Sequence, residues 1–339
     1  MFEGNKAYQN AVKRAAHSVE AEKFCNKKVL VTGSTGLIGT PLTDCLLSLG
    51  AFVFAAARTR EEFFERFCES EKLCYYEYDL MKELKEGEFD YIIHAASNAD
   101  PKMFDKEPVI TMTANFIGAY NLLEHLRKQG HGRLIYISTG EVYGQYDGKS
   151  DAFSEDYSGY VNFTEPRGCY PSSKRAAENL AVCYKAQYGT DFVTVRLSHT
   201  YGPTQRESDS RAMSEFFRLA AKGSDIVLRS KGETVRSYTC VFDAVSAILT
   251  AAAEGKSGEA YNCANRNSVV SIGGLAEAVA KSADVNVIYD IGDVKGAGNI
   301  ARGVLDGSKL EAIGWVPMYD LERGVKITLD VLQEDNAKK

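Results

Sequence analysis

Short apolar runs alternate with longer, helix-periodic segments through the first two hundred residues. The runs are rich in Val, Ile, Leu and Ala, which is typical of strands buried on both faces. This alternation of strand and helix predicts a parallel, doubly wound sheet of the α/β class. The expected strands are residues 28–32, 51–57, 74–78, 90–95, 133–137 and 192–197, and the expected helices are a segment ending at 49, then 107–128 and 170–189.

Shorter elements follow residue 200 and predict a second, smaller mixed α/β domain. Its expected helices are 212–222, 243–254, 272–281 and a closing helix after 320, and its expected strands are 226–228, 235–241 and 287–289. An amphipathic helix from about residue 5 to 23 precedes the first strand. We therefore expect a helical extension over 1–26, a doubly wound domain over 27–200 to which a strand and helix near 235–255 return, and the smaller domain over 201–339.

Composition and charge narrow the function classes. The chain has 339 residues and a formal net charge of -6, which argues against a general binder of nucleic acid or of anionic membranes. Its eight cysteines are scattered, without a Cys-x-x-Cys pair or a histidine at metal-ligand spacing, so we expect free thiols and no metal site. The first residues lack a secretory signal, and no apolar run approaches the length of a membrane span. We expect a cytoplasmic protein.

A glycine-rich turn joins the first strand to its helix, with the sequence Gly33-Ser34-Thr35-Gly36-Leu37-Ile38-Gly39. Glycines at this spacing let the chain turn tightly, bring a pyrophosphate close to the backbone and pack the helix against the sheet. The helix N-terminus then offers free N–H groups to the phosphates. The turn predicts a Rossmann-like dinucleotide site, and its candidate cofactor-binding residues are Gly33, Gly36, Leu37, Ile38 and Gly39.

The ends of the next strands bear on which dinucleotide is bound. NAD-preferring folds place an acid at the end of the second strand to hold the ribose hydroxyls. Here that strand ends at Ala57 and Arg58 follows, which favours the 2′-phosphate of NADP over NAD. Asp79 ends the third strand, where its carboxylate can receive the adenine amino group. Further candidate cofactor contacts are Asp79, Leu80, Ala95 and Ala96, and Ser97 follows as a candidate substrate contact.

A tyrosine and a lysine stand four residues apart in Tyr170-Pro171-Ser172-Ser173-Lys174, at the start of a long helix-periodic run. On a helix, side chains at this spacing share one face. An ammonium one turn away favours the phenolate and lowers its pKa, so the pair can exchange protons with a sugar hydroxyl. Tyr170 and Lys174 are candidate catalytic residues, and both are also candidate cofactor contacts.

With these motifs placed, the chain resembles the extended short-chain dehydrogenase/reductase family, specifically its NAD(P)-dependent nucleotide-sugar epimerases and dehydratases. The resemblance covers residues 28–328. The stretch Ser-Thr-Gly-Glu-Val-Tyr-Gly at 138–144 is similar to the active-site motif of sugar-nucleotide 4,6-dehydratases and UDP-glucuronate decarboxylases. Similarity to the decarboxylases is strongest at 155–157, 165–170, 174–178 and 108–121.

The resemblance implies a shared chemistry. Tyr170, assisted by Lys174 and by a hydrogen bond from Thr139, would remove the proton of a sugar C4 hydroxyl while the cofactor accepts the hydride. The resulting 4-ketone acidifies the C5 hydrogen, and Glu141 stands where a base for C5 is needed. Gly140 departs from the family, because dehydratases place an Asp there that protonates the departing hydroxyl. Thr139 and Glu141 complete the candidate catalytic set.

The resemblance also implies substrate contacts and a partner. Arg236 and Arg302 match family positions whose guanidinium groups hold the diphosphate, and in the decarboxylases the first of them lies near the sugar carboxylate. His199 takes a place where relatives often carry an asparagine that contacts substrate. Ser97 and Thr139 are further substrate-binding candidates. Family members commonly pair through their two long helices, here 107–128 and 170–189, so a homodimer is expected.

Three functions remain open on the sequence. The first is a nucleotide-sugar lyase that works through a 4-keto intermediate, either a uronate decarboxylase or a 4,6-dehydratase. The second is a nucleotide-sugar epimerase or an NADPH-dependent keto-sugar reductase, and Arg58 would suit a reductase. The third is a non-catalytic dinucleotide-binding redox sensor, which would have no need of Thr139, Tyr170 and Lys174 together.

Overall fold

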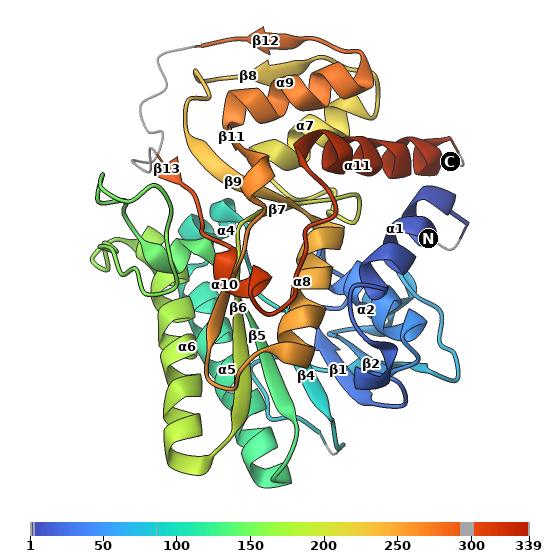
Figure 1. The fold of residues 1–339 in the computed structure, drawn as a ribbon, viewed down its shortest axis with the longest axis vertical. Coiled ribbons are helices and arrows are strands. Elements are labelled where there is room, and N and C mark those ends of the chain that lie inside the picture. Colours follow the sequence, from blue (N-terminus) through green and yellow to red (C-terminus); the bar gives the residue numbers. More distant parts are fainter. Residues whose placement is uncertain (1, 3, 86, 292–301, 338–339) are drawn as a thin grey trace.

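Seven parallel strands form the main sheet of the protein (Figure 1). The computed structural model describes residues 2, 4–85, 87–291 and 302–337. The strand order is β3-β2-β1-β4-β5-β6-β10, and every pairing within it is parallel. The predicted fold class is confirmed. The strands are β1 Lys28–Thr32, β2 Phe52–Ala57, β3 Leu73–Glu77, β4 Tyr91–His94, β5 Arg133–Thr139, β6 Asp191–Leu197 and β10 Ala260–Cys263.

Helices cover both faces of this sheet, and the strand sequence explains why. Successive side chains of a strand point to opposite faces. Val29 and Val31 of β1 therefore join the apolar cluster beneath α2 and α8, whereas Leu30 joins the cluster beneath α5 and α6. Figure 1 shows these two helix layers on either side of the strands. The helices are α2 Gly39–Ser48, α5 Pro108–Gln129, α6 Cys169–Tyr188 and α8 Val241–Glu254.

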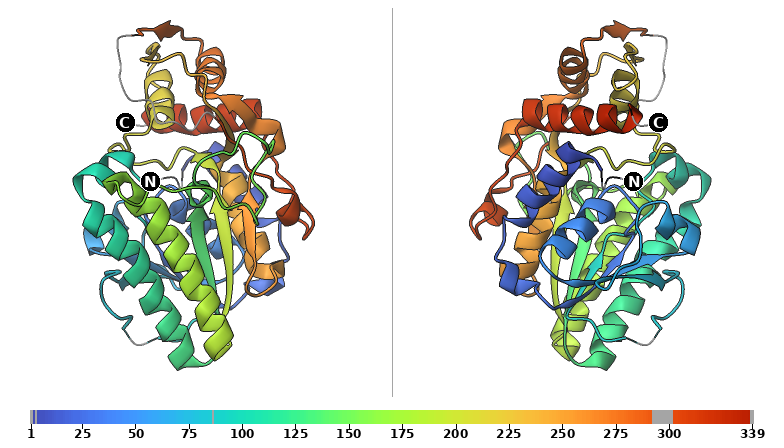
Figure 2. Two further views of the ribbon diagram at one scale, coloured as in Figure 1. Left: turned by 90° about the vertical axis from the view of Figure 1, so that its left-hand side faces the viewer. Right: turned by 90° about the vertical axis from the view of Figure 1, so that its right-hand side faces the viewer.

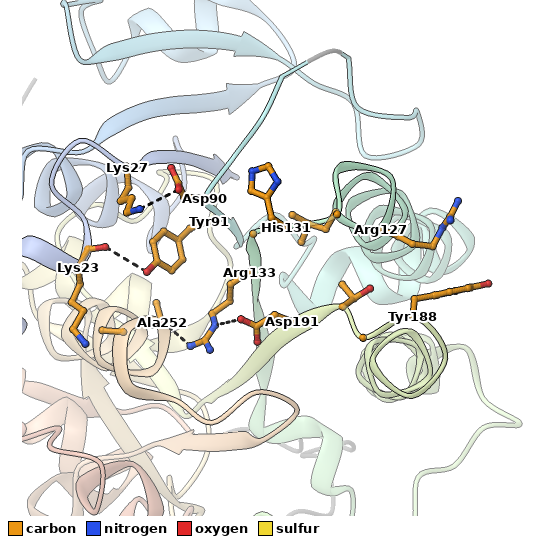
Figure 3. Close-up of a pocket in the computed structure, with 16 residues that line it drawn as sticks. Lys23, Lys27, Asp90, Tyr91, Arg127, His131, Arg133, Tyr188, Asp191 and Ala252 are labelled. Carbon is orange, nitrogen blue, oxygen red and sulfur yellow. Dashed lines mark hydrogen bonds and ion pairs between the residues drawn. The ribbon is translucent and has the colours of Figure 1, made fainter.

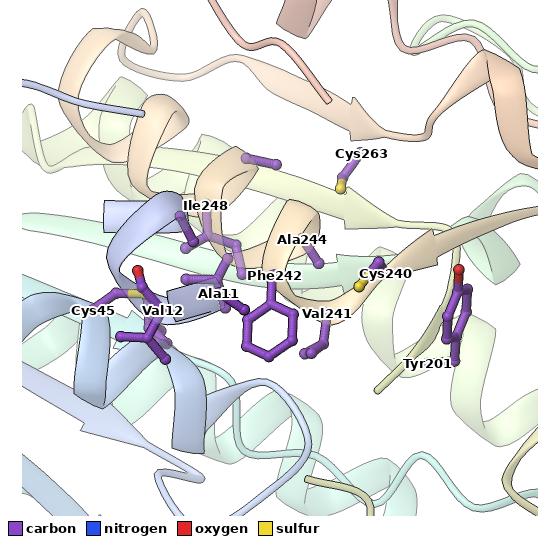
Figure 4. Packing of buried hydrophobic residues seen from close by; sticks show 14 of the residues in the cluster. Ala11, Val12, Cys45, Tyr201, Cys240, Val241, Phe242, Ala244, Ile248 and Cys263 are labelled. Atoms are coloured by element: carbon purple, nitrogen blue, oxygen red, sulfur yellow. The ribbon is translucent and has the colours of Figure 1, made fainter. Parts of the chain in front are cut away.

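The amino-terminal helix α1 (Lys6–Ala16) packs on this body as an extension, as predicted. Asn5 caps it by accepting a hydrogen bond from the Tyr8 N–H. Its apolar face, with Ala11 and Val12, lies against α2 and α8, and Figure 4 shows these two residues beside Cys45 and Phe242. The hydroxyl of Tyr8 donates to Asp44 Oδ2 at 2.6 Å. The helix ends seven residues before the expected boundary at 23.

The smaller domain lies beside the carboxyl end of the main sheet (Figures 1 and 2). Strand β9 pairs with β7, β11 and β13, and β8 pairs with β12. Three helices, α7, α9 and α11, pack on one another beside these strands. The elements are β7 His199–Tyr201, α7 Ala212–Ala220, β8 Ile226–Leu228, β9 Val235–Cys240, β11 Val269–Ser271, α9 Ile272–Ala283, β12 Val287–Tyr289, β13 Arg302–Gly303 and α11 Leu321–Asn336.

The segment that returns to the main sheet differs from the expected one. Helix α8 returns as predicted and is buried over nearly its whole length, because it is apolar on all sides. The strand that returns is β10 at 260–263, which pairs with β6. Strand β9 at 235–240 joins the smaller sheet instead, since β7 follows β6 almost directly and offers it an edge. Short elements that the periodicity did not predict are α3 Arg60–Phe64, α4 Pro101–Lys106 and α10 Ser308–Glu311.

Candidate active site

The glycine-rich turn packs tightly against the end of β4. Gly33 has a φ of 69°, and a Cβ atom added there would lie 2.7 Å from the Cα of Ala96. At Gly39 an added Cβ would lie 2.1 Å from the Gly33 carbonyl oxygen. Only glycine fits at either place. The turn therefore keeps its backbone exposed at the N-terminus of α2, beside Ala95 and Ala96, and this cradle fits the pyrophosphate of a dinucleotide.

Two other candidate cofactor contacts lie at the ends of neighbouring strands. Arg58 follows β2 with its side chain exposed, and it pairs with Glu62 at 3.0 Å. Asp79 follows β3 and accepts a hydrogen bond from the Met81 N–H at 3.0 Å. Leu80 is partly buried, and its carbonyl accepts from Asn121. These residues lie at the same carboxyl end of the sheet as the glycine-rich turn, because β3, β2 and β1 are neighbouring parallel strands.

Thr139 and Tyr170 meet at the carboxyl end of β5. Thr139 is the last residue of β5, and Tyr170 lies in the first turn of α6. Burial raises the pKa of the Tyr170 phenol well above its ordinary value, and the Glu141 charge raises this pKa further. Hydrogen bonding by Thr139 and Ser97 and the charge of Arg211 act in the lowering direction. In the protein by itself the phenol is thus kept protonated.

Lys174 lies one turn along α6 from Tyr170, as the spacing predicted, but its ammonium is engaged elsewhere. Nζ donates to the Ile137 carbonyl at 2.9 Å and lies 4.8 Å from the centre of the Tyr136 ring. Burial lowers the pKa of Lys174 to about 7. The expectation that Lys174 lowers the pKa of the Tyr170 phenol is therefore wrong for the protein alone. Burial disfavours both charged forms, the phenolate and the ammonium, and the four-residue spacing does not reveal this burial.

Glu141 reaches the same site from a short 3-10 turn at 140–143. Its N–H donates to the Thr139 hydroxyl at 3.2 Å, which fixes the turn. Both carboxylate oxygens accept from Nη2 of Arg167, at 3.0 and 2.9 Å. The Arg167 guanidinium lies 4.7 Å from the centre of the Phe104 ring, and Phe104 stacks on Tyr170 with ring centroids 4.5 Å apart. Glu141 thus lies close to the catalytic candidate, in a fixed ion pair.

Gly140 lacks a side chain, and a neighbouring residue fills the space. A Cβ atom added at Gly140 would lie 3.0 Å from a methyl group of Leu305, which comes from the smaller domain. Leu305 is buried, and its N–H donates to Ser237 Oγ. The place between Thr139 and Glu141 therefore meets an apolar side chain and carries no proton donor of its own.

A buried chain of hydrogen bonds ends at the backbone carbonyl of Tyr170. Ser97 Oγ donates to Asn115 Oδ1 at 2.8 Å, and Asn115 Nδ2 donates to Ser173 Oγ at 3.0 Å. Ser173 in turn donates to the Tyr170 carbonyl at 3.0 Å. These bonds link the end of β4, helix α5 and the first turn of α6. Asn115 therefore braces the loops around the site and has no reactive partner of its own.

Basic residues of the smaller domain gather on another side of the site. His199 Nε2 accepts from Arg236 Nη1 at 2.5 Å, and burial, Arg236 and Arg211 together lower the His199 pKa to about 3. The imidazole is therefore neutral and serves as a hydrogen-bonding wall. Arg211 is held by Asp209, with Nη2 2.5 Å from Oδ2. Arg302 Nε donates to the Asp151 carbonyl at 2.8 Å, on the loop that follows residue 144.

The segment 203–211 ties this domain to the glycine-rich turn. Thr204 Oγ1 donates to the Leu37 carbonyl at 2.7 Å, and Arg206 Nη2 donates to Thr35 Oγ1 at 2.9 Å. Further along, Ser210 Oγ donates to Asp100, the cap of α4. One connected site therefore contains the glycine-rich turn, helix α4 with Phe104, and the basic residues of the smaller domain.

Sequence reasoning assigned no role in this site to Phe104 and Arg167, and it favoured a solvated surface position for Arg211. A signal existed for the first, because Asp100-Pro101 is a capping residue followed by a proline at the first helical position. For the other two no local pattern exists, since their partners lie elsewhere in the chain or depend on how a polar loop folds.

Comparison with known proteins places the chain in a family. Residues 29–264 match the model of the NAD dependent epimerase/dehydratase family. The chain is 30% identical over 318 residues to UDP-glucuronic acid decarboxylase 1 of Xenopus tropicalis, covering 91% of this chain and 73% of that protein. It is also 30% identical over 321 residues to UDP-glucuronic acid decarboxylase 3 of Arabidopsis thaliana, covering 92% and 90%. The chain therefore belongs to the NAD dependent epimerase/dehydratase family.

Solved structures share the fold. UDP-glucose 4-epimerase of Thermotoga maritima, with UDP-glucose, aligns with a TM-score of 0.80 at 24% identity, over 92% of this chain and all of that one (100%). dTDP-glucose 4,6-dehydratase of Bacillus anthracis, in complex with NAD, gives 0.78 at 23%, over 92% and 98%. RMD of Pseudomonas aeruginosa, complexed with NADPH, gives 0.72 at 24%, over 91% and 99%.

Together, the family and the site define an enzyme that modifies nucleotide sugars and uses a nicotinamide dinucleotide. This confirms the family resemblance drawn from the sequence, and it excludes the non-catalytic sensor. Within the described residues, no helix is long and apolar enough to cross a membrane.

Proposed function

We propose that the protein is a nucleotide-sugar lyase of the uronate decarboxylase type, acting through a 4-keto intermediate. The observation that carries this choice is the arrangement at the end of β5. Glu141 is present beside Tyr170, while the place of Gly140 is closed by Leu305. Loss of water from C6 needs an acid at the departing hydroxyl, whereas loss of carbon dioxide from a β-keto acid needs none. The UDP-glucuronic acid decarboxylases, at 30% identity, support the same choice.

The residues of the chain divide the work as follows. The cofactor, when bound, supplies a hydride acceptor and a positive ring at the carboxyl end of the sheet. That positive charge favours the Tyr170 phenolate, which takes the proton of the C4 hydroxyl while Thr139 hydrogen-bonds to the tyrosine oxygen. Once C4 is a ketone, the C5–C6 bond breaks, its electron pair forms an enolate, and Tyr170 and Thr139 stabilise the oxygen. Carbon dioxide leaves in this step, and Glu141 is the carboxyl group placed to deliver the proton that C5 then takes up.

The test of this function is a panel of nucleotide sugars incubated with the enzyme and, in parallel, NADP or NAD, with product masses measured. UDP-glucuronate is expected to lose the mass of carbon dioxide. Loss of water from UDP- or dTDP-glucose would make the enzyme a dehydratase, and a change of stereochemistry at constant mass would make it an epimerase. Either result would overturn the proposal. An epimerase is the second candidate, because UDP-glucose 4-epimerase of Thermotoga maritima shares the fold over 92% of this chain.

For the cofactor we propose NADP over NAD, on the position of Arg58. Its guanidinium follows β2 where an acid would bind the ribose of NAD, and among the described residues it pairs with Glu62 alone, with the Arg58 side chain exposed. We expect Arg58→Ala to weaken NADP binding by about tenfold, the loss of one charge-assisted contact, and to leave NAD within about twofold. Equal changes for both dinucleotides in a titration of the purified protein would contradict this preference.

We also propose that the enzyme is a homodimer, joined through α5 and α6. The two helices lie side by side on the outside of the molecule (Figure 2). Large apolar side chains on them face solvent, namely Val109 (72% exposed), Met112, Phe116, Tyr120 and Val182. Except for Val182, they recur at three- and four-residue spacing along α5, which is the pattern of a helix-packing face. Sedimentation of Phe116→Glu should show monomers, while the parent chain sediments as a dimer.

A further inference from the structure

Arg167 stands between Glu141 and the aromatic wall of the site, at the point where the loop that follows residue 144 enters α6. Its Nη2 serves both oxygens of Glu141, and its guanidinium plane lies over Phe104, which stacks on Tyr170. The Arg167 guanidinium, the Phe104 ring and the Tyr170 phenol therefore form one stack, in that order. This stack fixes the position of the Arg167 positive charge relative to the Tyr170 hydroxyl.

Most of the donor capacity of Arg167 remains available. A guanidinium carries five N–H donors on three nitrogens. Among the described residues, only Nη2 of Arg167 donates a hydrogen bond, and its side chain is 43% exposed. Nε and Nη1 therefore keep their N–H donors, and Nη1 can donate a charge-assisted hydrogen bond to a second carboxylate. The neighbouring Arg211 differs, because its Nε–Nη2 edge is already occupied by Asp209.

We propose that Arg167 is the residue that makes the site specific for a sugar carrying a carboxylate, by bridging that carboxylate and Glu141. The inference rests on the proposed lyase function. A uronate carboxylate entering beside Glu141 would meet a like charge a few ångströms away, and this repulsion disfavours binding. A guanidinium that holds Glu141 with Nη2 and the substrate carboxylate with Nη1 converts the repulsion into two ion pairs. An uncharged hexose gains nothing from this arrangement.

The test is a comparison of two ligands that differ only at C6, UDP-glucuronate and UDP-glucose. Their dissociation constants would be measured by calorimetry on the full chain loaded with reduced cofactor, so that oxidation at C4 does not proceed. We expect the parent enzyme to prefer UDP-glucuronate. Arg167→Gln should weaken UDP-glucuronate about tenfold or more while leaving UDP-glucose within about twofold. Arg167→Lys, which keeps the charge but loses the fork, should fall between.

Two further variants separate recognition from a structural effect. Glu141→Gln removes the repelling charge, so it should tighten UDP-glucuronate and leave UDP-glucose unchanged. Arg175→Gln is the matched control, because within the described part of the chain Arg175 donates hydrogen bonds to the Val142 and Gly159 carbonyls and to no carboxylate. It should change both ligands alike. Circular dichroism of each variant would confirm that the fold is intact.

Some outcomes overturn the inference and leave the proposed function standing. If the parent enzyme releases carbon dioxide from UDP-glucuronate but Arg167→Gln keeps its preference for that ligand, then another group recognises the carboxylate. Equal weakening of both ligands would likewise reduce Arg167 to a structural role. Conversely, a preference that depends on Arg167, without release of carbon dioxide, would uphold the recognition and refute the decarboxylase.

Discussion

The two ends of the parallel sheet both carry charged side chains, but they differ in what those charges do. At the amino end a cavity of about 550 Å³ lies between the C-termini of α5, α6 and α8 (Figure 3). Arg133 there pairs with Asp191 at 2.7 Å and donates to the carbonyls of Ala252 and Gly255. Lys27 pairs with Asp90 at 3.3 Å. These cations neutralise acids and the negative ends of helices, which is a structural task.

The carboxyl end holds a different chemistry. Tyr170 and Lys174 are buried with strongly shifted pKa values, and among the described residues neither forms an ion pair. Glu141 is held next to them by Arg167. The comparison shows that a cavity by itself is a poor guide to function. Buried titratable groups that converge on one point are the better guide, because a shifted pKa is what proton transfer requires.

The largest effect is expected at the carboxyl end, from Tyr170→Phe. Removing the hydroxyl removes the group that accepts and returns the proton at C4. Turnover should fall by about a thousandfold or more, within the range for general acid–base groups. Binding of the dinucleotide should change by less than about threefold, since the phenyl ring keeps its stack on Phe104. Activity close to that of the parent enzyme would remove Tyr170 from the mechanism.

The next effect in size comes from Glu141→Gln. Product formation should fall by about a hundredfold, because the proton at C5 has no carboxyl group to move it. Reduction of the bound nicotinamide, which needs only the C4 chemistry, should persist. An absorbance trace of the cofactor alongside product analysis separates these two steps. An enzyme that acts at C4 alone would keep its full rate in this variant.

Lys174 allows a test by pH. Its pKa is about 7 in the folded chain, below the ordinary 10.5. Between these values the unfolded chain binds more protons, so stability should rise with pH from about 7 to 10. Below pH 7 the buried ammonium costs up to about 5 kcal/mol. Lys174→Met should therefore raise the melting temperature more at pH 6 than at pH 9. An equal rise at both values would mean that the ammonium is not buried.

The smallest effect on activity is expected at the amino end. Arg133→Met leaves two carbonyls and Asp191 without their donor, so it should cost about 1–3 kcal/mol of stability. The activity of each folded molecule should stay within about twofold of the parent value. Denaturant unfolding and a rate normalised to folded protein measure the two quantities. A large loss of activity would show that the two ends of the sheet are coupled.

Most of the main sheet could be predicted because its strands are short apolar runs, and the glycine-rich turn marks the edge where a ligand binds. The i, i+4 spacing of Tyr170 and Lys174, at the start of a helix-periodic run, also predicted that both residues lie on one helix, which is α6. The addition of β10 to the main sheet could not be predicted, since its pairing with β6 depends on which edge strand of that sheet has no other partner. Nor could the pairing of Arg167 with Glu141, which are 26 residues apart and joined by a polar loop. The raised phenol pKa depends on burial that no spacing reports.

The most direct test of the account mixes the NADP-loaded enzyme rapidly with UDP-glucuronate and follows the nicotinamide absorbance and the product mass together. The account predicts that reduced nicotinamide rises and then decays while a product lighter by carbon dioxide accumulates. It also predicts that neither signal occurs with Tyr170→Phe. Release of carbon dioxide without any transient reduction, or no change in either signal with the parent enzyme, would contradict it.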